Sequence, residues 1–116
     1  MKPKNLSNRK IRHLRIRKKV YGTEARPRLC VFKSNKYLYC QIINDEKNFI
    51  ICGKSTKSIP LENKKTLEAS KQLGIEVAKL CQKFNITNLV FDRAGYLYHG
   101  KIKQLADTIR QEGIKI

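Results

Sequence analysis

Residues 28–54, RLCVFKSNKYLYCQIINDEKNFIICGK, decide the fold of this chain. They contain three runs rich in aromatic, β-branched and other apolar residues: 28–33, 37–43 and 48–54. The runs are joined by the short polar segments SNK and NDEK, which is typical of adjacent antiparallel strands, so the stretch predicts a three-stranded meander. In the middle run, Leu38, Cys40 and Ile42 alternate with other side chains, and we expect their face of the strand to be buried.

Beyond the meander, the sequence predicts two helices and one more strand. Residues 67–84 and 101–112 carry apolar residues at helical spacing, and Gly113 is placed to end the second helix. Between the helices, residues 86–91 (ITNLVF) predict a short buried strand. Loops are expected at 55–66 and 92–100. The predicted class is α/β, of an α+β-like kind: a meander extended by the fourth strand into a mixed sheet, with two packing helices.

The first quarter of the chain is dominated by positive charge. The 116 residues include 26 Lys and Arg against 9 Asp and Glu, a net charge of +17. Eleven of these basic residues and one acid, Glu24, lie in residues 1–28, so this segment contributes +10. Charge of this size on a small chain indicates a polyanionic partner, either nucleic acid or an anionic membrane surface.

Residues 5–20 predict a basic helix, with Asn5 or Ser7 as its N-cap. Such a helix is marginal in water by itself. We therefore expect residues 1–27 to be a basic helix and linker ordered by RNA, and residues 28–116 to be a single α/β RNA-binding domain.

A membrane partner is disfavoured by the sequence. No run of about 18 apolar residues is present, so no transmembrane helix is expected. The basic helix lacks Trp and Phe on its ragged apolar stripe, which makes it a poor interfacial helix.

The loop DRAGYLYHG brings Asp92 and His99 close together in the sequence, as an active site would. However, it offers no nucleophile and no second carboxylate. A ribonuclease H-like arrangement would need several carboxylates around two metal ions, and Asp45 and Glu46 lie in a hairpin turn instead. We therefore expect no enzyme activity, and we expect Asp92 to pair with Arg93 or to cap local backbone N–H groups.

The four cysteines, Cys30, Cys40, Cys52 and Cys81, lack the close paired spacing of a zinc finger. They are expected to be small, buried apolar residues. No metal, cofactor or disulfide is predicted.

Three groups of residues carry a resemblance to a known family. They are Arg26-Pro27-Arg28-Leu29 with Val31, Ser34-Asn35-Lys36, Tyr39 and Gln41; then Ser55-Thr56; then Phe91-Asp92-Arg93, Gly95, Tyr98-His99-Gly100-Lys101, Lys103, Leu105, Ala106, Asp107 and Arg110. Over nearly its whole length the chain resembles the large-subunit ribosomal protein eighteen family of bacteria and plastids. Ala94 departs from the pattern, because the family usually has a second Gly there, and this puts the local loop geometry in doubt.

The resemblance implies a structural protein of the large ribosomal subunit. It implies binding to 5S rRNA and help in attaching this RNA to the 23S-type rRNA at the central protuberance, beside other 5S-associated proteins. It implies no catalysis and no small-molecule substrate. A ribosome of bacterial type is expected, and richness in Lys, Ile and Asn favours a plastid slightly over a bacterium.

Charge, aromatic content and the resemblance together predict the RNA-binding residues. They are Lys2, Lys4, Arg9, Lys10, Arg12, Arg15, Arg17, Lys18, Lys19, Arg26, Arg28, Ser34, Asn35, Lys36, Tyr39, Gln41, Ser55, Thr56, Arg93, Tyr96, Tyr98, His99, Gly100, Lys101 and Lys103.

Overall fold

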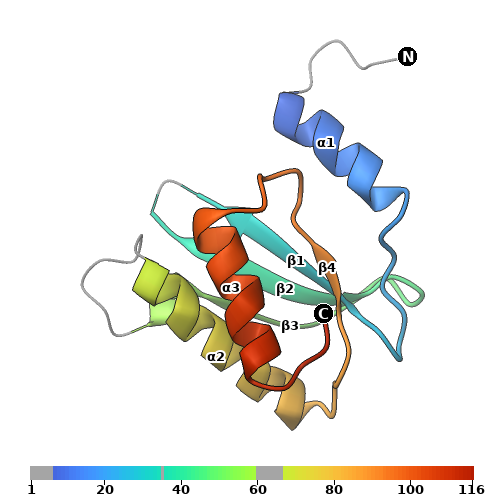
Figure 1. Ribbon diagram of the computed structural model, residues 1–116. Coiled ribbons are helices and arrows are strands. Elements are labelled where there is room, and N and C mark those ends of the chain that lie inside the picture. Colours follow the sequence, from blue (N-terminus) through green and yellow to red (C-terminus); the bar gives the residue numbers. More distant parts are fainter. Residues whose placement is uncertain (1–6, 35, 60–66) are drawn as a thin grey trace.

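A computed structural model describes residues 7–34, 36–59 and 67–116 of the chain. Within these residues, four strands form one mixed sheet beside three helices, which confirms the predicted α/β class (Figure 1). The strands lie in the order β3-β2-β1-β4 and are β1 (Arg28–Lys33), β2 (Leu38–Asn44), β3 (Phe49–Ser55) and β4 (Val90–Asp92). The first three pair antiparallel, as predicted for the meander, and β4 pairs parallel with β1.

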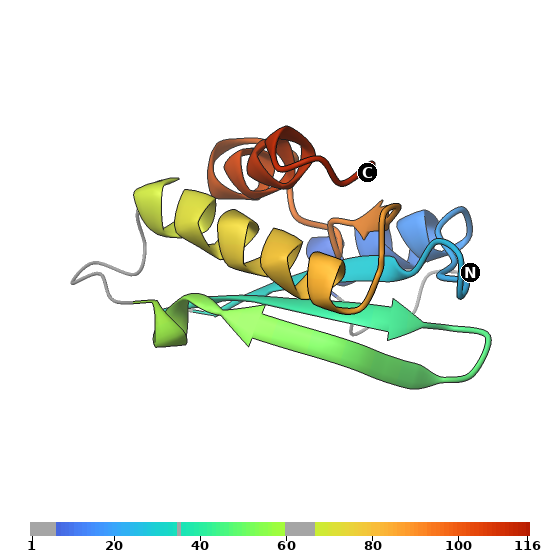
Figure 2. The same ribbon diagram turned by 90° about the horizontal axis from the view of Figure 1, so that it is seen from below.

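Two helices, α2 (Leu67–Lys83) and α3 (Gly100–Gln111), lie on the same side of the sheet (Figure 2). The hydrophobic core fills the space between them and the sheet. Leu38, Cys40 and Ile42 are buried there, which confirms the predicted core face of β2. They share one apolar cluster with Leu73 of α2 and Leu105 of α3. Removal of this apolar surface from water is the main force that holds the two layers together.

The fourth strand begins later than the sequence predicts. Residues 86–89 do not pair with β1, because their backbone meets the C-terminal segment instead. The N–H of Leu89 donates to the carbonyl of Lys115 at 2.7 Å, and the N–H of Lys115 donates to the carbonyl of Thr87 at 2.9 Å. Pairing with β1 starts only at Val90, so the prediction of a strand over 86–91 was wrong in its bounds.

Other boundaries differ by a few residues. The N-terminal helix, α1, spans Asn8–Arg17 rather than 5–20, and the Ser7 hydroxyl caps it by accepting from the N–H of Lys10 at 3.2 Å. Asn5, the other proposed cap, lies outside the described residues. β3 starts at Phe49 because Asn48 has a φ of 49° and belongs to the turn. Part of the predicted loop 55–66 forms a short 3-10 helix, Thr56–Ser58.

α1 stands beside the sheet, next to the segment that joins β4 to α3 (Figure 1). No helix among the described residues is long and apolar enough to cross a membrane.

Candidate nucleic-acid interface

Asp92, at the end of β4, is fully buried and joins three parts of the chain. One carboxylate oxygen, Oδ2, lies 2.6 Å from a guanidinium nitrogen of Arg28 and 3.0 Å from Nε2 of His13. The other, Oδ1, accepts from the N–H of Ala94 at 2.8 Å. Burial alone would raise the pKa of Asp92, but the hydrogen bonds from Ala94, His13 and Arg28 outweigh it and hold the pKa below its ordinary value. Of the two alternatives expected for Asp92, the structure confirms the backbone cap.

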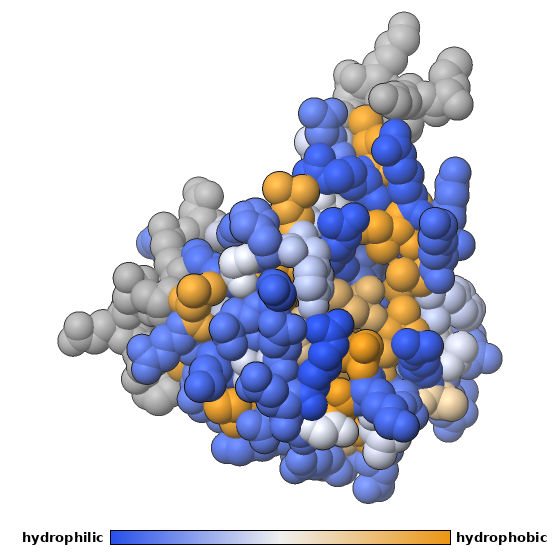
Figure 3. All heavy atoms as spheres, in the orientation of Figure 1, coloured by the Kyte–Doolittle hydropathy of each residue, from blue (hydrophilic) through white to orange (hydrophobic). Residues whose placement is uncertain are grey.

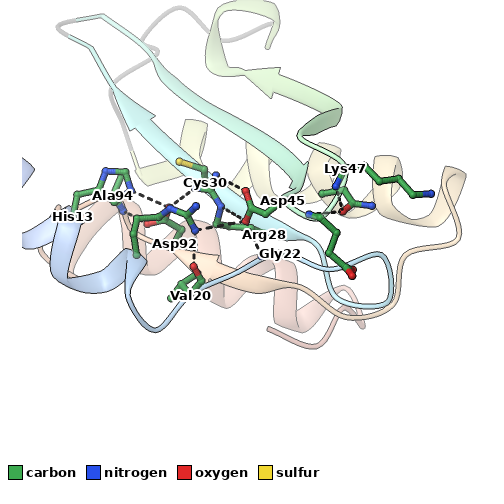
Figure 4. A network of polar contacts seen from close by, with 12 residues as sticks. His13, Val20, Gly22, Arg28, Cys30, Asp45, Lys47, Asp92 and Ala94 are labelled. Atoms are coloured by element: carbon green, nitrogen blue, oxygen red, sulfur yellow. Dashed lines mark hydrogen bonds and ion pairs between the residues drawn. The ribbon is translucent and has the colours of Figure 1, made fainter.

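Arg28 lies between two carboxylates, as Figure 4 shows. It donates to both oxygens of Asp45, at 2.9 and 3.1 Å, as well as to Asp92. Asp45 also accepts from the N–H of Gly22 at 2.7 Å. Burial opposes ionisation of Asp45, but Arg28 and Gly22 prevail and the pKa of this carboxyl is lowered. Only 8% of Arg28 is exposed, so the prediction that it contacts RNA is corrected. Its guanidinium stabilises the fold by binding Asp45 and Asp92.

α1 also packs against the segment 92–96. Arg9 donates to the carbonyl of Ala94 at 2.8 Å, and Arg12 donates to the carbonyl of Gly95 at the same distance. Ala94 has a φ of 53°. This left-handed conformation costs a residue with a side chain about 1–2 kcal/mol, which explains why glycine is usual there in the family that the chain resembles.

The two tyrosines of this loop have different surroundings. The Tyr96 hydroxyl accepts from the N–H of Lys33 at 3.0 Å and donates to its carbonyl at 3.2 Å. The Arg9 guanidinium lies 4.6 Å from the centre of its ring. Tyr96 thus holds the loop to β1 and to α1, and one of its ring faces is covered. Tyr98 is 37% exposed, its hydroxyl accepts from Arg110 at 2.7 Å, the Arg110 guanidinium lies 6.0 Å from the centre of its ring, and the ring meets that of Phe91 edge-on.

Several hydroxyl residues that were predicted to bind RNA form hydrogen bonds to the backbone. Thr56 is completely buried, and its hydroxyl accepts from the N–H of Leu38 at 3.0 Å. This burial excludes it as an RNA contact. The Ser55 hydroxyl caps the 3-10 helix by accepting from Lys57, and the Ser34 hydroxyl accepts from the N–H of Tyr37 in the β1–β2 turn.

The remaining predicted side chains divide by exposure. Exposed members are Lys10, Arg15, Lys18, Lys19, Arg26, Lys36, Gln41, Tyr98, His99, Gly100 and Lys103, and half-buried ones are Arg9, Arg12, Arg17, Tyr39, Arg93, Tyr96 and Lys101. Lys2, Lys4 and Asn35 lie outside the described residues. Tyr39 and Gln41 lie on the sheet face opposite the helices, where the Tyr39 ring lies 5.8 Å from that of Phe32.

A hollow of about 570 Å³ lies where α1 and β1 approach the N-terminus of α3. Its cationic or basic lining residues are Arg12, Lys33, His99 and Lys101. His99 is the N-cap of α3, but its side chain makes no capping hydrogen bond. A helix N-terminus surrounded by cations suits a phosphate group. Lys33 was missed from the sequence, because nothing in the strand pattern of β1 distinguishes it from an ordinary lysine at the end of a strand.

Among the described residues, His13, Cys30 and Asp92 form a group with metal-ligand chemistry, with ligand atoms within 4.8 Å of one another. The group is poorly suited to a metal ion. Burial raises the pKa of the Cys30 thiol to about 11, and Asp92 beside it acts in the same direction. The thiolate that a metal needs is therefore disfavoured, and the Asp92 carboxylate is already bound by Arg28 and His13.

We expect purified protein to contain no stoichiometric zinc. Elemental analysis of the unchanged chain and of Cys30→Ser should give the same metal content, well below one ion per chain. One zinc per chain that disappears in Cys30→Ser would contradict this expectation and would identify the group as a metal site.

Comparison with known proteins identifies the family of this chain. A family model described as "Ribosomal L18 of archaea, bacteria, mitoch. and chloroplast" matches residues 3–116. The chain belongs to the ribosomal L18 family. This confirms the resemblance drawn from the sequence motifs. L18 proteins are structural constituents of the large ribosomal subunit and not enzymes, so the chain is a non-enzymatic ribosomal protein.

Both bacterial and chloroplast L18 proteins are similar to the chain. The large ribosomal subunit protein uL18 of Mycoplasma mycoides is 50% identical over 107 residues, which cover 92% of each chain. That of Caldicellulosiruptor saccharolyticus is 47% identical over 111 residues, covering 92% of this chain and 90% of that protein. The uL18c protein of Spinacia oleracea is 46% identical over 113 residues, covering 92% of this chain and 68% of that protein. The identities are too similar to separate a plastid from a bacterial origin.

Proposed function

We propose that this L18 protein binds 5S rRNA and helps attach it to the 23S-type rRNA at the central protuberance. Other 5S-associated ribosomal proteins would be its neighbours there. The observation that carries the proposal is the hollow at the N-terminus of α3, where cations from α1, β1 and α3 meet. The family supports an association with the ribosome, and the geometry supports a phosphate backbone as the ligand.

The charge distribution favours RNA backbone over any small anion. On the face seen in Figure 3, hydrophilic side chains predominate over α3, and they alternate with hydrophobic ones along α1. α1 also carries exposed cations outside the hollow, namely Lys10 and Arg15 with Lys18 and Lys19 at its end, so the protein can neutralise more than one phosphate. Contacts of this kind give affinity and register.

Bases would be read by the aromatic side chains. Tyr98 is accessible beside the hollow, and Phe32 and Tyr39 lie together on the open face of the sheet. Stacking of unpaired bases on such rings is the usual way in which proteins recognise irregular RNA. We therefore assign phosphate binding to α1 and the α3 N-terminus, and base stacking to Tyr98 and to the Tyr39 pair.

The acids around Arg28 are poorly placed for RNA cleavage. Asp45 and Asp92 are the two acids that meet around Arg28, and hydrogen bonds from the protein occupy both carboxylates. They have no free oxygen for the metal ions that a nuclease of the ribonuclease H type requires.

The ribosome that this protein serves is of bacterial type. Richness in Lys, Ile and Asn supports placing it in a plastid, and the chloroplast protein of Spinacia oleracea is among its relatives. Bacterial relatives are as similar, so a plastid origin rests on composition alone.

Substitutions at the hollow test the proposed site. We expect Lys33→Ala and His99→Ala each to weaken binding to 5S rRNA by about 1–3 kcal/mol, because each removes a contact to phosphate. The melting temperature should change little, since both side chains are exposed. Fluorescence anisotropy with transcribed 5S rRNA measures the affinity, and circular dichroism measures the melting temperature.

Lys83→Ala, at the far end of α2, is the matched control, because Lys83 is an exposed lysine remote from the hollow. If all three variants bind equally well, the hollow is not an RNA site. If Lys33→Ala or His99→Ala lowers the melting temperature and spares binding by the folded fraction, the side chain has a structural role only.

A further inference from the structure

α1 has two different faces, although both carry cations. Side chains three and four positions apart face the rest of the protein and are half-buried: Arg9, Arg12, His13, Ile16 and Arg17. Other basic side chains of the helix and its C-terminal end are exposed, and we call them the outward row: Lys10, Arg15, Lys18 and Lys19. The hidden side chains recur at helical spacing, whereas Lys18 and Lys19 of the outward row follow Arg17, the last residue of the helix. A helix that became ordered only on binding RNA would not bury one side against the rest of the protein.

Each polar side chain on the hidden side has an acceptor on the protein. Arg9 and Arg12 donate to backbone carbonyls of the segment 92–95, both at 2.8 Å. His13 Nε2 lies 3.0 Å from the buried carboxylate of Asp92. Arg17 lies 3.5 Å from the carboxylate of Asp45. The hidden side is therefore a polar interface with four separate contacts.

The backbones of the two segments also touch. Gly95 has a φ of 81°, and a Cβ built there would lie 2.0 Å from the carbonyl oxygen of Arg9 and 2.9 Å from the amide nitrogen of His13. Both obstacles are backbone atoms, so no side-chain rotation can relieve the clash. Only glycine allows α1 to lie this close to the loop.

Charge balance favours the same contact. The group formed by buried Arg28 and Asp92 and half-buried Asp45 has two negative charges and one positive charge, so it carries a net charge of −1. α1 presents Arg17 and His13 to these carboxylates. Two of the 9 acidic residues in the chain, Asp45 and Asp92, face this helix. Their negative charge repels RNA, so their position beside the helix indicates another role, which is to hold the helix.

We propose that Asp45, Asp92 and Gly95 are positioning residues that dock α1 on the domain and so aim the outward row at a polyanion. The residues on the hidden side hold α1 to the domain, Arg12 among them also lines the hollow, and the outward row binds phosphate. Docking fixes the direction of the row before contact, which removes part of the ordering cost of association. Residues 8–17 are then part of the folded unit, which moves the domain boundary expected at residue 28. Docking itself does not depend on the proposed function, whereas the role of the outward row rests on it.

Two matched pairs of variants in the full chain test docking without RNA. Gly95→Ala creates the clash with α1, whereas Gly113→Ala introduces a side chain at another positive φ, 96°, with no atom within 4 Å. His13→Ala removes the contact with Asp92, whereas Leu14→Ala changes the neighbouring side chain, which is 50% exposed. The readout is the heteronuclear ¹⁵N NOE of the amides of residues 8–17, compared with those of α2.

In the unchanged chain, and in Gly113→Ala and Leu14→Ala, the amides of α1 should have NOE values close to those of α2. In Gly95→Ala and His13→Ala they should fall clearly below them while the values of α2 stay the same. Docking is refuted if α1 is already as mobile as a free chain end in the unchanged protein. It is equally refuted if the two members of each pair behave alike.

A binding measurement tests the second half of the proposal. Gly95→Ala should weaken binding of transcribed 5S rRNA roughly tenfold, and Gly113→Ala less than twofold. Loss of docking with unchanged affinity would refute the positioning role. If the unchanged chain does not bind 5S rRNA, the proposed function fails, and the NOE data still decide whether α1 is docked.

Discussion

Raising the salt concentration from about 50 to about 200 mM should weaken binding of this L18 protein to 5S rRNA by roughly 10³-fold, as for about six to ten phosphate contacts. Each cation that neutralises a phosphate releases a condensed counterion, so the dependence is steep and nearly linear on logarithmic axes. The outward row, Lys33, Lys36 and Lys103 supply enough exposed cations within the described residues. Arg28 is excluded from this count because it is buried and paired.

Dissociation constants measured across a KCl series give the slope. A Lys18→Ala/Lys19→Ala double variant should make the slope shallower by about two contacts, since both lysines are exposed. Removal of Lys79 and Lys83 from α2 should leave it unchanged. A nearly flat response of the unchanged chain would show that phosphate contacts do not dominate binding.

Asp92→Ala should lower the free energy of unfolding by about 3–5 kcal/mol, the usual cost of removing one partner of a buried ion pair. The variant leaves Arg28 buried with Asp45 as its one remaining acid, and it removes the acceptor of the Ala94 N–H and of His13. Urea unfolding at pH 7 measures the loss. Asp107→Ala is the matched control: this acid pairs with Arg110 on the surface of α3, where both side chains are over 40% exposed, so little change is expected.

Acid titration gives an independent check of the same carboxylate. The pKa of Asp92 is lower in the folded protein than its ordinary value of 3.8. Its stabilising contribution is therefore complete above that ordinary value and is lost as the pH falls through the lower pKa of the folded state. Asp92→Ala should lose less stability than the unchanged chain over this acidic range. Equal losses in both proteins would show that Asp92 is not the carboxylate responsible.

The meander and its core face could be predicted because their signals are local. Leu38, Cys40 and Ile42 alternate along one strand, and the turns on both sides are short and polar. The start of β4 could not be predicted in the same way. Residues 86–89 have strand-like composition, but their pairing partner is Lys115, far along the chain. Composition indicates that a segment will be extended and does not indicate which strand it will meet.

The positive charge of the candidate site could be predicted from the sequence, but which of its basic residues are buried and which are exposed could not. The sequence indicates that the first quarter of the chain is basic, and it gives no sign that Arg28 is buried while Lys19 is exposed. His13 was absent from the predicted site because its partner, Asp92, lies 79 positions away. The raggedness of the apolar stripe on α1 now has a physical reason: the surface that this helix meets consists of carbonyls and carboxylates, so arginine and histidine replace leucine on its hidden side.

Arg28 and His13 reach the Asp92 carboxylate from separate parts of the chain. We therefore expect substitutions at these three positions to depend on one another during evolution. Interaction energies within such a network are not additive, so the effect of changing one member depends on the others. A lineage that loses the acid leaves Arg28 buried without that partner, and replacement of the arginine becomes favourable only afterwards. Across relatives, these three positions should therefore be retained together or replaced together, whereas exposed lysines of the outward row can move along the helix independently as long as the charge is kept.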